Sequence, residues 1–372
     1  MKIAFDARQL NKKLEGIGVY LSHVVDYVLE KGHEVVLVSD QPKMFWKPAR
    51  HRSRCRVVWR PRRRNLNVFL SSFIWQEVEL PRLLNKIRPD VYHAPGNEGV
   101  PEGLKMPSVL TMHDLSALVI PDYYGHNSYY KHAAYGLSIH RADAIACISK
   151  YTQQELQRIF PDVNEKTFLN YNGIDPLDET GENPFAAKAP YIVYNGRFSI
   201  RKNIDVLVRA FAKIARMPQY DDLSLLLMGS RIKDFVRIKS LVRELGLSKR
   251  VEFTGYVPRE VLGPIIRDAT CSVYPSKYEG FGFPPLEAMS VGCPVIVSHN
   301  TALIETVGTA GIQVPTGEIN PLVQAIIRLS QDPRLRKRMV ERGYRNVRRF
   351  SWNRHGAKLV SKYQGLTKKP KK

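Results

Sequence analysis

Long apolar runs, paired cysteines and acidic residues are all scarce in this sequence of 372 residues. No apolar run approaches the roughly 18 residues that a membrane-spanning helix requires, and the first residues read as a strand rather than a signal peptide. The four cysteines are irregularly spaced and form no C-x-x-C pair. This argues against a disulfide framework or a zinc site and predicts reduced, mostly buried thiols. These absences predict a soluble protein of the cytoplasm.

The shortage of acidic residues leaves a large positive charge. Lys and Arg number 57 against 35 Asp and Glu, a net charge of +22, which favours a polyanionic partner or surface. Between Gln41 and Gln76 there is no acid at all. The basic residues of this segment are Lys43, Lys47, Arg50, Arg52, Arg54, Arg56, Arg60, Arg62, Arg63 and Arg64, and its aromatic residues are Phe45, Trp46, Trp59, Phe69, Phe73 and Trp75.

Three interpretations of this basic aromatic segment stay open. It binds nucleic acid, it is an ordinary solvated basic face, or it docks on an anionic bilayer with its aromatic rings at the interface. No recognisable nucleic-acid module accompanies it, so docking on an anionic membrane surface is the preferred expectation and no nucleic-acid partner is expected. The predicted location is the cytoplasm, with a peripheral position on the inner face of the plasma membrane left open.

Short apolar runs alternate with amphipathic helical patterns along most of the chain, which indicates parallel sheets covered on both faces. The alternation restarts near Tyr191 after a Pro-, Gly- and acid-rich stretch without periodicity. We therefore predict an α/β protein with two facing, doubly wound, Rossmann-like domains and a cleft between them. The expected parts are an N-terminal domain (1–175), a linker (176–190), a second domain (191–350), and a C-terminal helix with a basic tail (351–372).

Two glutamates eight positions apart flank a glycine-rich loop. Glu279 is predicted to project from this loop and Glu287 from the first turn of a following helix that begins near Pro285. The glycines allow backbone to approach a ligand, and free N–H groups before a helix hold hydroxyl or phosphate oxygens. Two such carboxylates suit the hydroxyls of two linked sugars. The simpler alternative is a solvated loop acid and a helix-capping glutamate.

Two cations, Arg197 and Lys202, lie between a predicted strand and a predicted helix. Such a pair would hold a diphosphate and neutralise the charge that it gains as it departs. The alternative is that both are ordinary surface cations. His113 also follows a predicted strand, where an imidazole would hydrogen-bond a sugar; a structural histidine is the alternative.

These segments resemble one family. Glu279–Glu287, with its Gly280-Phe281-Gly282-Phe283-Pro284 loop, looks like the E-x7-E signature of the retaining GT-B glycosyltransferases of family four. Four further stretches also resemble elements of that family: Asn195-Gly196-Arg197 through Arg201-Lys202-Asn203, Phe253-Thr254-Gly255-Tyr256-Val257, Asn172-Gly173-Ile174-Asp175, and Gly16-Ile17-Gly18-Val19-Tyr20. The last lacks the third glycine of a dinucleotide fingerprint.

The resemblance implies a GT-B fold, a nucleotide-sugar donor and transfer with retention. It also implies that the domain 1–175 binds the acceptor and the domain 191–350 binds the donor. The catalytic residues that it implies are Glu279, Arg197, Lys202 and His113. The donor-binding residues that it implies are Gly16, Gly196, Tyr256, Val257, Gly280, Phe281, Gly282, Phe283, Leu286 and Glu287. A hexosyl donor is expected, with GDP-mannose as the first choice, and a glycan or lipid-linked acceptor of cell-surface polysaccharide synthesis.

Some motifs are absent. The sequence contains no D-x-D, H-x-H or H-E-x-x-H, so neither a metal nor another cofactor is expected. Two rival functions remain: a nucleotide-sugar epimerase of GT-B-like fold, which would need no acceptor, and a basic nucleic-acid-binding protein, whose affinity would fall steeply with salt.

Overall fold

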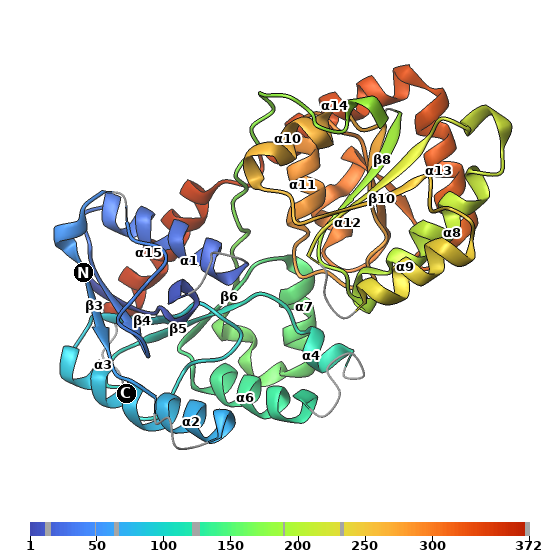
Figure 1. Ribbon diagram of the computed structural model, residues 1–372. Helices are drawn as coiled ribbons and strands as arrows, with labels where there is room; N and C mark the ends of the chain where they lie inside the picture. The colour runs from blue at the N-terminus through green and yellow to red at the C-terminus, as the bar shows by residue number, and fades with distance from the viewer. Residues whose placement is uncertain are drawn as a thin grey trace. The chain divides into compact units, whose positions relative to one another are not determined.

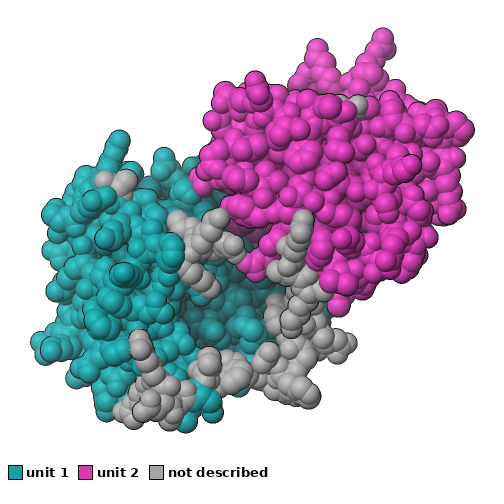
Figure 2. Space-filling view, viewed as in Figure 1, with its two compact units in different colours: residues 1–173, 351–372 teal, residues 174–350 magenta. Residues whose placement is uncertain are grey.

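The computed structural model describes residues 1–11, 16–48, 50–62, 67–120, 127–188, 190–230 and 234–368. The chain divides into two compact units, which Figure 2 distinguishes by colour. Unit 1 comprises residues 1–173 and 351–372, and unit 2 comprises residues 174–350. Among the described residues, no helix is both long enough and apolar enough to cross a membrane.

Unit 1 is built on a seven-stranded parallel sheet of order β3-β2-β1-β4-β5-β6-β7. Alternate residues of a strand point to opposite faces, so Ala4 joins one apolar cluster while Ile3 and Phe5 join another. Both faces are therefore buried, as the apolar runs predict. The elements are β1 (Lys2–Asp6), α1 (Ile17–Glu30), β2 (Glu34–Ser39), β3 (Cys55–Trp59), α2 (Val68–Ile74), α3 (Leu80–Ile87), β4 (Val91–Ala94), β5 (Ser108–Met112), α4 (Ser116–Val119), α6 (Asn127–Arg141), β6 (Ala144–Cys147), α7 (Lys150–Ile159), β7 (Thr167–Leu169) and α15 (Trp352–Thr367).

Unit 2 repeats the design with a six-stranded parallel sheet of order β10-β9-β8-β11-β12-β13. Helices α8 and α13 pack side by side (Figure 1). The elements are β8 (Tyr191–Asn195), η6 (Ile200–Lys202), α8 (Ile204–Ile214), β9 (Ser224–Met228), α9 (Phe235–Glu244), β10 (Val251–Gly255), α10 (Arg259–Arg267), β11 (Cys271–Tyr274), α11 (Phe283–Ser290), β12 (Val295–Ser298), α12 (Leu303–Val307), η8 (Gly308–Ala310), β13 (Ile312–Val314), α13 (Ile319–Gln331) and α14 (Pro333–Val347). The prediction of two doubly wound α/β domains is confirmed.

The segment that the sequence assigns to a linker, 176–190, falls within unit 2 and is hydrogen-bonded to its elements. The backbone N–H of Leu177 donates to Ser290 Oγ over 3.0 Å. The Asn183 amide donates to the hydroxyl of Tyr191 over 2.7 Å. Its polar, aperiodic composition gives no sign of these contacts, because backbone and side-chain hydrogen bonds rather than apolar packing make them.

The basic aromatic segment is partly structural, because one of its aromatic residues lies in the core and not at the surface. Trp75 is buried, its indole N–H donates to Arg60 O over 3.1 Å, and the Arg8 guanidinium lies 4.5 Å from its ring centroid. The segment also supplies β3, one of the two edge strands of the unit 1 sheet. The sequence did not predict this strand, because the basic residues around it obscure any strand pattern. Arg63, Arg64 and the side chain of Phe69 lie outside the described residues, as does the tail after Lys368.

The C-terminal helix α15 lies beside α1 in unit 1 (Figure 1). A buried chain of hydrogen bonds connects it to the strands. Tyr363 on α15 contacts His93 Nδ1 at 2.5 Å, and His93 Nε2 contacts Thr111 Oγ1 at 2.7 Å. Tyr20 on α1 contacts the same Thr111 oxygen at 2.7 Å and lies 3.3 Å from His355 Nε2. Each of these buried side chains therefore has a hydrogen-bond partner, which offsets the loss of its contacts with water.

This network predicts that unit 1 loses stability in mild acid. Burial, reinforced by neighbouring histidines, lowers the pKa of His93 to about 3; burial also lowers the pKa of His355 to about 4. Both values lie below the ordinary pKa of about 6.5, so as the pH falls through 6.5 the unfolded chain binds protons first. Each histidine is expected to cost unit 1 about 2 kcal/mol of unfolding free energy between pH 8 and pH 5.

Tryptophan fluorescence during urea unfolding measures this effect in unit 1 alone, because all four tryptophans (Trp46, Trp59, Trp75 and Trp352) belong to that unit. A His93→Gln variant should be less stable at pH 8 but should show a shallower loss between pH 8 and pH 5. An unfolding free energy of the unaltered protein that stays constant over that range would contradict the assignment.

Candidate functional site

The charged residues that the motifs of unit 2 predict lie where the strand order of its sheet reverses. In the order β10-β9-β8-β11-β12-β13, successive strands run outward from β8 on one side and from β11 on the other. Loops leaving two such adjacent strands separate, and the crevice between them is the usual ligand position in an open α/β sheet. Arg197 and Lys202 follow β8, and Glu279 follows β11, so the topology brings these sequence-predicted residues to the same edge of the sheet.

Glycines lie at the carboxyl ends of the adjacent strands β8, β9 and β10 at this edge. Gly196, after β8, donates its N–H to Met228 O over 2.9 Å. Gly229, after β9, donates its N–H to Gly255 O over 2.8 Å and has φ +156°. A Cβ on Gly229 would lie 1.9 Å from Gly196 O, a distance that no side chain permits. The backbone turns at this edge are therefore packed directly on one another.

Glu279 lies at the centre of the cluster and is only 7% exposed. Lys202 Nζ donates to Glu279 Oε1, and Arg201 Nη1 lies 3.7 Å from Glu279 Oε2. Arg201 Nη1 also donates to Tyr278 O over 2.8 Å, and the N–H of Glu279 donates to Thr301 Oγ1 over 3.1 Å. Loops that follow β8, β11 and β12 thus position one carboxylate and two cations together.

The ionisation of Glu279 follows from these contacts. Burial is the largest influence on its pKa and opposes ionisation, but the charges of Lys202 and Arg201 outweigh burial, so the pKa of Glu279 lies below its ordinary value. At neutral pH the carboxylate accepts hydrogen bonds and donates none. The cluster therefore offers acceptors to hydroxyl groups and two cations to an anion.

The second glutamate of the motif is held differently from the expectation. Helix α11 begins at Phe283, two residues before the predicted start at Pro285, so Glu287 is its fifth residue and lies beyond the first turn. The prediction that Glu287 caps or projects from the first turn is therefore wrong. Its Oε1 accepts from Arg259 Nη1 over 2.6 Å, and Arg259 Nη2 donates to Asp175 O, also over 2.6 Å.

The loop between the two glutamates is mostly buried. Gly280, Phe281, Gly282 and Leu286 are buried, and Phe283 is half-buried. Gly282 has φ +93°, and a Cβ there would lie 2.7 Å from Leu303 Cδ2. The positive φ favours glycine at this position, which is the N-cap of α11.

Other sequence-predicted residues of unit 2 are more accessible. The Arg197 side chain is exposed, and its carbonyl accepts from the Tyr194 hydroxyl over 3.0 Å. Two more predicted residues follow β10, which is one of the two edge strands of the sheet. They are Tyr256, which is 57% exposed, and Val257, which is half-buried. Of the two predicted cations, Lys202 donates directly to Glu279.

In unit 1, the two predicted site residues, Gly16 and His113, both lie between regular elements. Gly16 has φ +47° and precedes α1. His113 directly follows β5, its Nε2 lies 2.7 Å from Pro95 O, and its ring meets that of Tyr20 edge-on with 4.9 Å between centroids. Because a carbonyl only accepts, Nε2 carries the proton in the neutral ring and Nδ1 is the acceptor. Burial lowers the pKa of His113, so the ring is neutral at pH 7.

A pocket of about 520 Å³ lies beside His113 in unit 1, at the reversal of strand order between β1 and β4. Pro95 and Asn97, which contact His113, line it as well. Two ion pairs, Asp6–Arg8 at 2.6 Å and Asp40–Arg62 at 2.5 Å, leave it with little unbalanced charge. Its remaining lining residues are Gln9, Asn11, Ile17, Gln41, Ser72, Gln76, Gly96, Glu98, Lys131 and Tyr135.

Three residues with a place in these sites were missed from the sequence. Arg201 stands inside a quoted motif, so its proximity to Glu279 could have been inferred. Arg259 and Asn97 act through contacts that bridge 28 and 16 positions of the chain, for which a single sequence carries no signal. Within the described ranges, no group of three or more His, Cys, Asp or Glu side chains is arranged to hold a metal ion.

Comparison with known proteins gives consistent matches over most of the chain. Residues 14–177 match the family described as Glycosyltransferase Family 4, and residues 178–346 match Glycosyl transferases group 1. The O-antigen chain mannosyltransferase B of Escherichia coli is 29% identical over 299 residues, which cover 74% of each chain.

Two solved structures share the fold. Sucrose-phosphate synthase from Thermosynechococcus elongatus has a TM-score of 0.77 at 23% identity, over 98% of each chain. Anabaena HepE, solved in complex with UDP and glucose, has a TM-score of 0.74 at 18% identity, over 98% of this chain and 100% of HepE. The fold is therefore GT-B, as the sequence resemblance implies. The chain belongs to the GT-B glycosyltransferases of the family-four-like group.

Proposed function

We propose that the protein is a retaining, metal-independent hexosyltransferase that takes its sugar from a nucleotide-sugar donor. GDP-mannose is the first candidate donor, because the named E. coli relative is a mannosyltransferase. The proposed acceptor is a glycan or a lipid-linked glycan of cell-surface polysaccharide synthesis. The observation that carries the proposal is the buried Glu279 carboxylate with Lys202 and Arg201 at the reversal point of the unit 2 sheet.

The cluster suggests what happens when the donor binds. Without the donor, Lys202 and Glu279 neutralise each other. A diphosphate would compete for Lys202, and the sugar hydroxyls would take its place on Glu279. As the sugar–phosphate bond breaks, the leaving diphosphate gains negative charge, which Lys202 and Arg201 stabilise. These cations would do the work of a metal ion, in keeping with the absence of a D-x-D sequence.

Retention requires the acceptor hydroxyl to attack from the face that the diphosphate leaves. Our proposal assigns removal of the acceptor proton to a diphosphate oxygen. His113 Nδ1 would accept a hydrogen bond from a hydroxyl of the transferred sugar. The neighbouring polar pocket of unit 1 would hold the acceptor, since its amides and its balanced charge suit the many hydroxyls of a glycan.

A panel of nucleoside diphosphates tests the donor assignment. At a concentration one hundred times its Kd, a ligand stabilises the unit that it binds by about 2.7 kcal/mol. For a unit of this size that corresponds to a rise in Tm of roughly 5–10 °C. GDP is expected to give the largest rise in calorimetry, with inorganic pyrophosphate as the control for general anion binding. No rise beyond the pyrophosphate effect with any nucleoside diphosphate would contradict the proposed function.

We also propose that the basic aromatic segment, residues 41–76, docks on anionic membrane. Phe45, Trp59 and Phe73 are 76%, 46% and 51% exposed, and the exposed Lys47 and Arg56 belong to the same segment. Aromatic rings at the interface and cations on the headgroups are the two contributions that reversible attachment needs. A membrane-held acceptor would make this attachment useful.

Vesicle sedimentation tests the docking. A Lys47→Gln/Arg56→Gln variant is expected to bind phosphatidylglycerol vesicles at least tenfold more weakly, since each basic residue near such a surface contributes about 1 kcal/mol. Lys86→Gln/Lys105→Gln removes the same charge from exposed positions of unit 1 outside the segment and should bind like the unaltered protein. Equal binding to neutral phosphatidylcholine vesicles would rule out the electrostatic mechanism.

A further inference from the structure

A hollow on unit 2 is lined by three arginines and shares no lining residue with the Glu279 cluster. It has a volume of about 560 Å³ and lies between helix α14 and the turn η8. None of its lining residues is acidic. They are Thr309, Ala310, Arg342, Arg345, Asn346 and Arg349.

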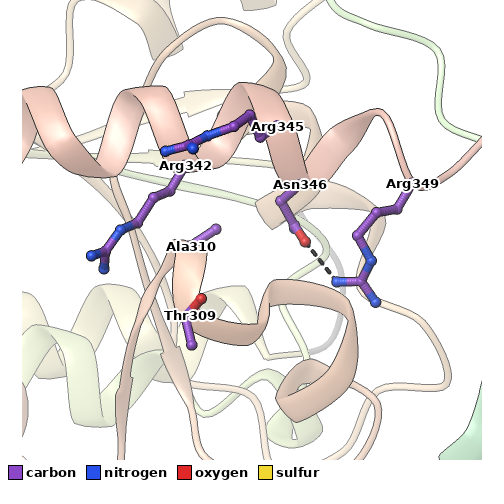
Figure 3. Close-up of a pocket in the computed structure, with 6 residues that line it drawn as sticks. All are labelled: Thr309, Ala310, Arg342, Arg345, Asn346 and Arg349. Carbon is purple, nitrogen blue, oxygen red and sulfur yellow. Dashed lines mark hydrogen bonds between the residues drawn. The ribbon is translucent and has the colours of Figure 1, made fainter.

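Three of these residues lie on one face of α14, because Arg345 and Asn346 follow Arg342 by three and four positions. Arg349 lies in the turn that follows the end of α14 at Val347. Figure 3 shows Arg342 extending from α14 and Arg349 from the turn after it, on either side of Asn346 and toward the side on which Thr309 and Ala310 lie. The hollow therefore has one strongly basic wall and one wall of backbone and a hydroxyl side chain.

Part of this basic wall is held in place before any ligand arrives. Asn346 is buried, and its Nδ2 donates to Thr306 O over 2.8 Å. Its Oδ1 accepts from Arg349 Nη1 over 2.7 Å, the contact drawn in Figure 3. Arg349 Nη2 donates to Glu305 O over 3.3 Å. The Arg349 guanidinium thus has a fixed position, which lowers the entropy that a ligand would lose in ordering it.

The charge of the hollow calls for an anion. Three guanidinium groups around one space repel one another, and no lining carboxylate offsets the repulsion. A guanidinium presents its donors in a planar fork that matches phosphate oxygens. The volume also falls within the range of small-molecule sites, roughly 300–1,000 Å³, and exceeds what a single phosphate would fill.

From this geometry we propose that the hollow between α14 and η8 is a second binding site of the protein, for a soluble phosphate ester. The arginines bind the phosphate of this ligand, and Thr309 and Ala310 of η8 face the remainder of the ligand. The same phosphate chemistry occurs in lipid headgroups, but the lining includes no aromatic side chain that would enter a bilayer interface. The ligand is therefore assigned to the soluble source.

Equilibrium dialysis of the full chain against radiolabelled inorganic pyrophosphate tests the site. The variant Arg342→Gln/Arg345→Gln removes two guanidinium groups. Among the described residues, these two groups make one hydrogen bond, from Arg345 Nε to Glu341 O inside α14, so little structure depends on them. The control, Arg334→Gln/Lys337→Gln, removes the same charge from exposed positions of the same helix that do not line the hollow. Both variants keep the Glu279 cluster, so any pyrophosphate bound there contributes equally to both.

The unaltered protein is expected to bind pyrophosphate in a component that weakens at least tenfold in the Arg342/Arg345 variant and less than twofold in the control. Equal weakening in both variants, or none in either, would overturn the proposal. Sedimentation with phosphatidylglycerol vesicles separates the two phosphate sources. Equal vesicle binding by the two variants supports the soluble ligand, whereas a loss confined to the Arg342/Arg345 variant would overturn that assignment in favour of a headgroup.

Discussion

Replacing Lys202 or Glu279 by alanine is expected to lower the transfer rate by about 10²–10³-fold, the usual effect of removing one preorganised group that stabilises developing charge. Lys202 would no longer neutralise the leaving diphosphate, and Glu279 would no longer accept hydrogen bonds from the sugar. Because each is the other's ion-pair partner, each substitution also changes the charge around the one that remains. Initial rates with a labelled nucleotide sugar and a glycan acceptor measure the loss.

Matched controls separate a catalytic loss from an effect of charge or folding. Lys239 on α9 and Glu260 on α10 are exposed residues of unit 2. Lys239→Ala and Glu260→Ala should transfer sugar at nearly the unaltered rate. Thermal unfolding of all four variants shows whether unit 2 is still folded. Near-normal turnover in folded Lys202→Ala and Glu279→Ala proteins would refute the site assignment.

Gly229→Ala is expected to destabilise unit 2 by at least about 3 kcal/mol and to abolish most transfer. The added Cβ would lie 1.9 Å from Gly196 O, and φ +156° is itself unfavourable for alanine. Because the clashing partner, the Gly196 carbonyl, belongs to the backbone, it cannot rotate away as the end of a flexible side chain would. Relief requires the Gly196–Arg197 turn to move, and this turn leads to Lys202.

Gly246→Ala is the control for backbone strain alone. Gly246 has φ +72°, but nothing lies within 4 Å of a Cβ built there. Its substitution should cost only about 1 kcal/mol and should leave transfer unchanged. Calorimetry of both variants gives the comparison. A Gly229→Ala protein as stable and active as Gly246→Ala would show that the turns are not packed as described.

The sequence predicts the central strands of both sheets because each is a short, mainly apolar run between helical patterns. Examples are the observed strands Val91–Ala94, Ser108–Met112, Tyr191–Asn195 and Cys271–Tyr274. It misses the edge strand β3, whose residues are half-buried or exposed. β3 carries Arg56 among its five residues and has no such run, so the segment was interpreted only as a surface.

The candidate site divides in the same way. Glu279 and Lys202 lie in motifs whose positions after strands imply one edge of a sheet, and the structure brings them into contact. The partner of Glu287 is different. Arg259 lies 28 positions away on another helix, and only the packing of α10 on α11 brings the two together. No periodicity or spacing in a single sequence encodes that contact.

A crystal structure with the nucleoside diphosphate that raises Tm most would test the central claim directly. We expect diphosphate oxygens within hydrogen-bond distance of Lys202 Nζ, with the Gly280–Phe283 backbone beside them and Glu279 released toward the position of the missing sugar. A diphosphate bound elsewhere on the protein, with the Lys202–Glu279 ion pair intact, would contradict it.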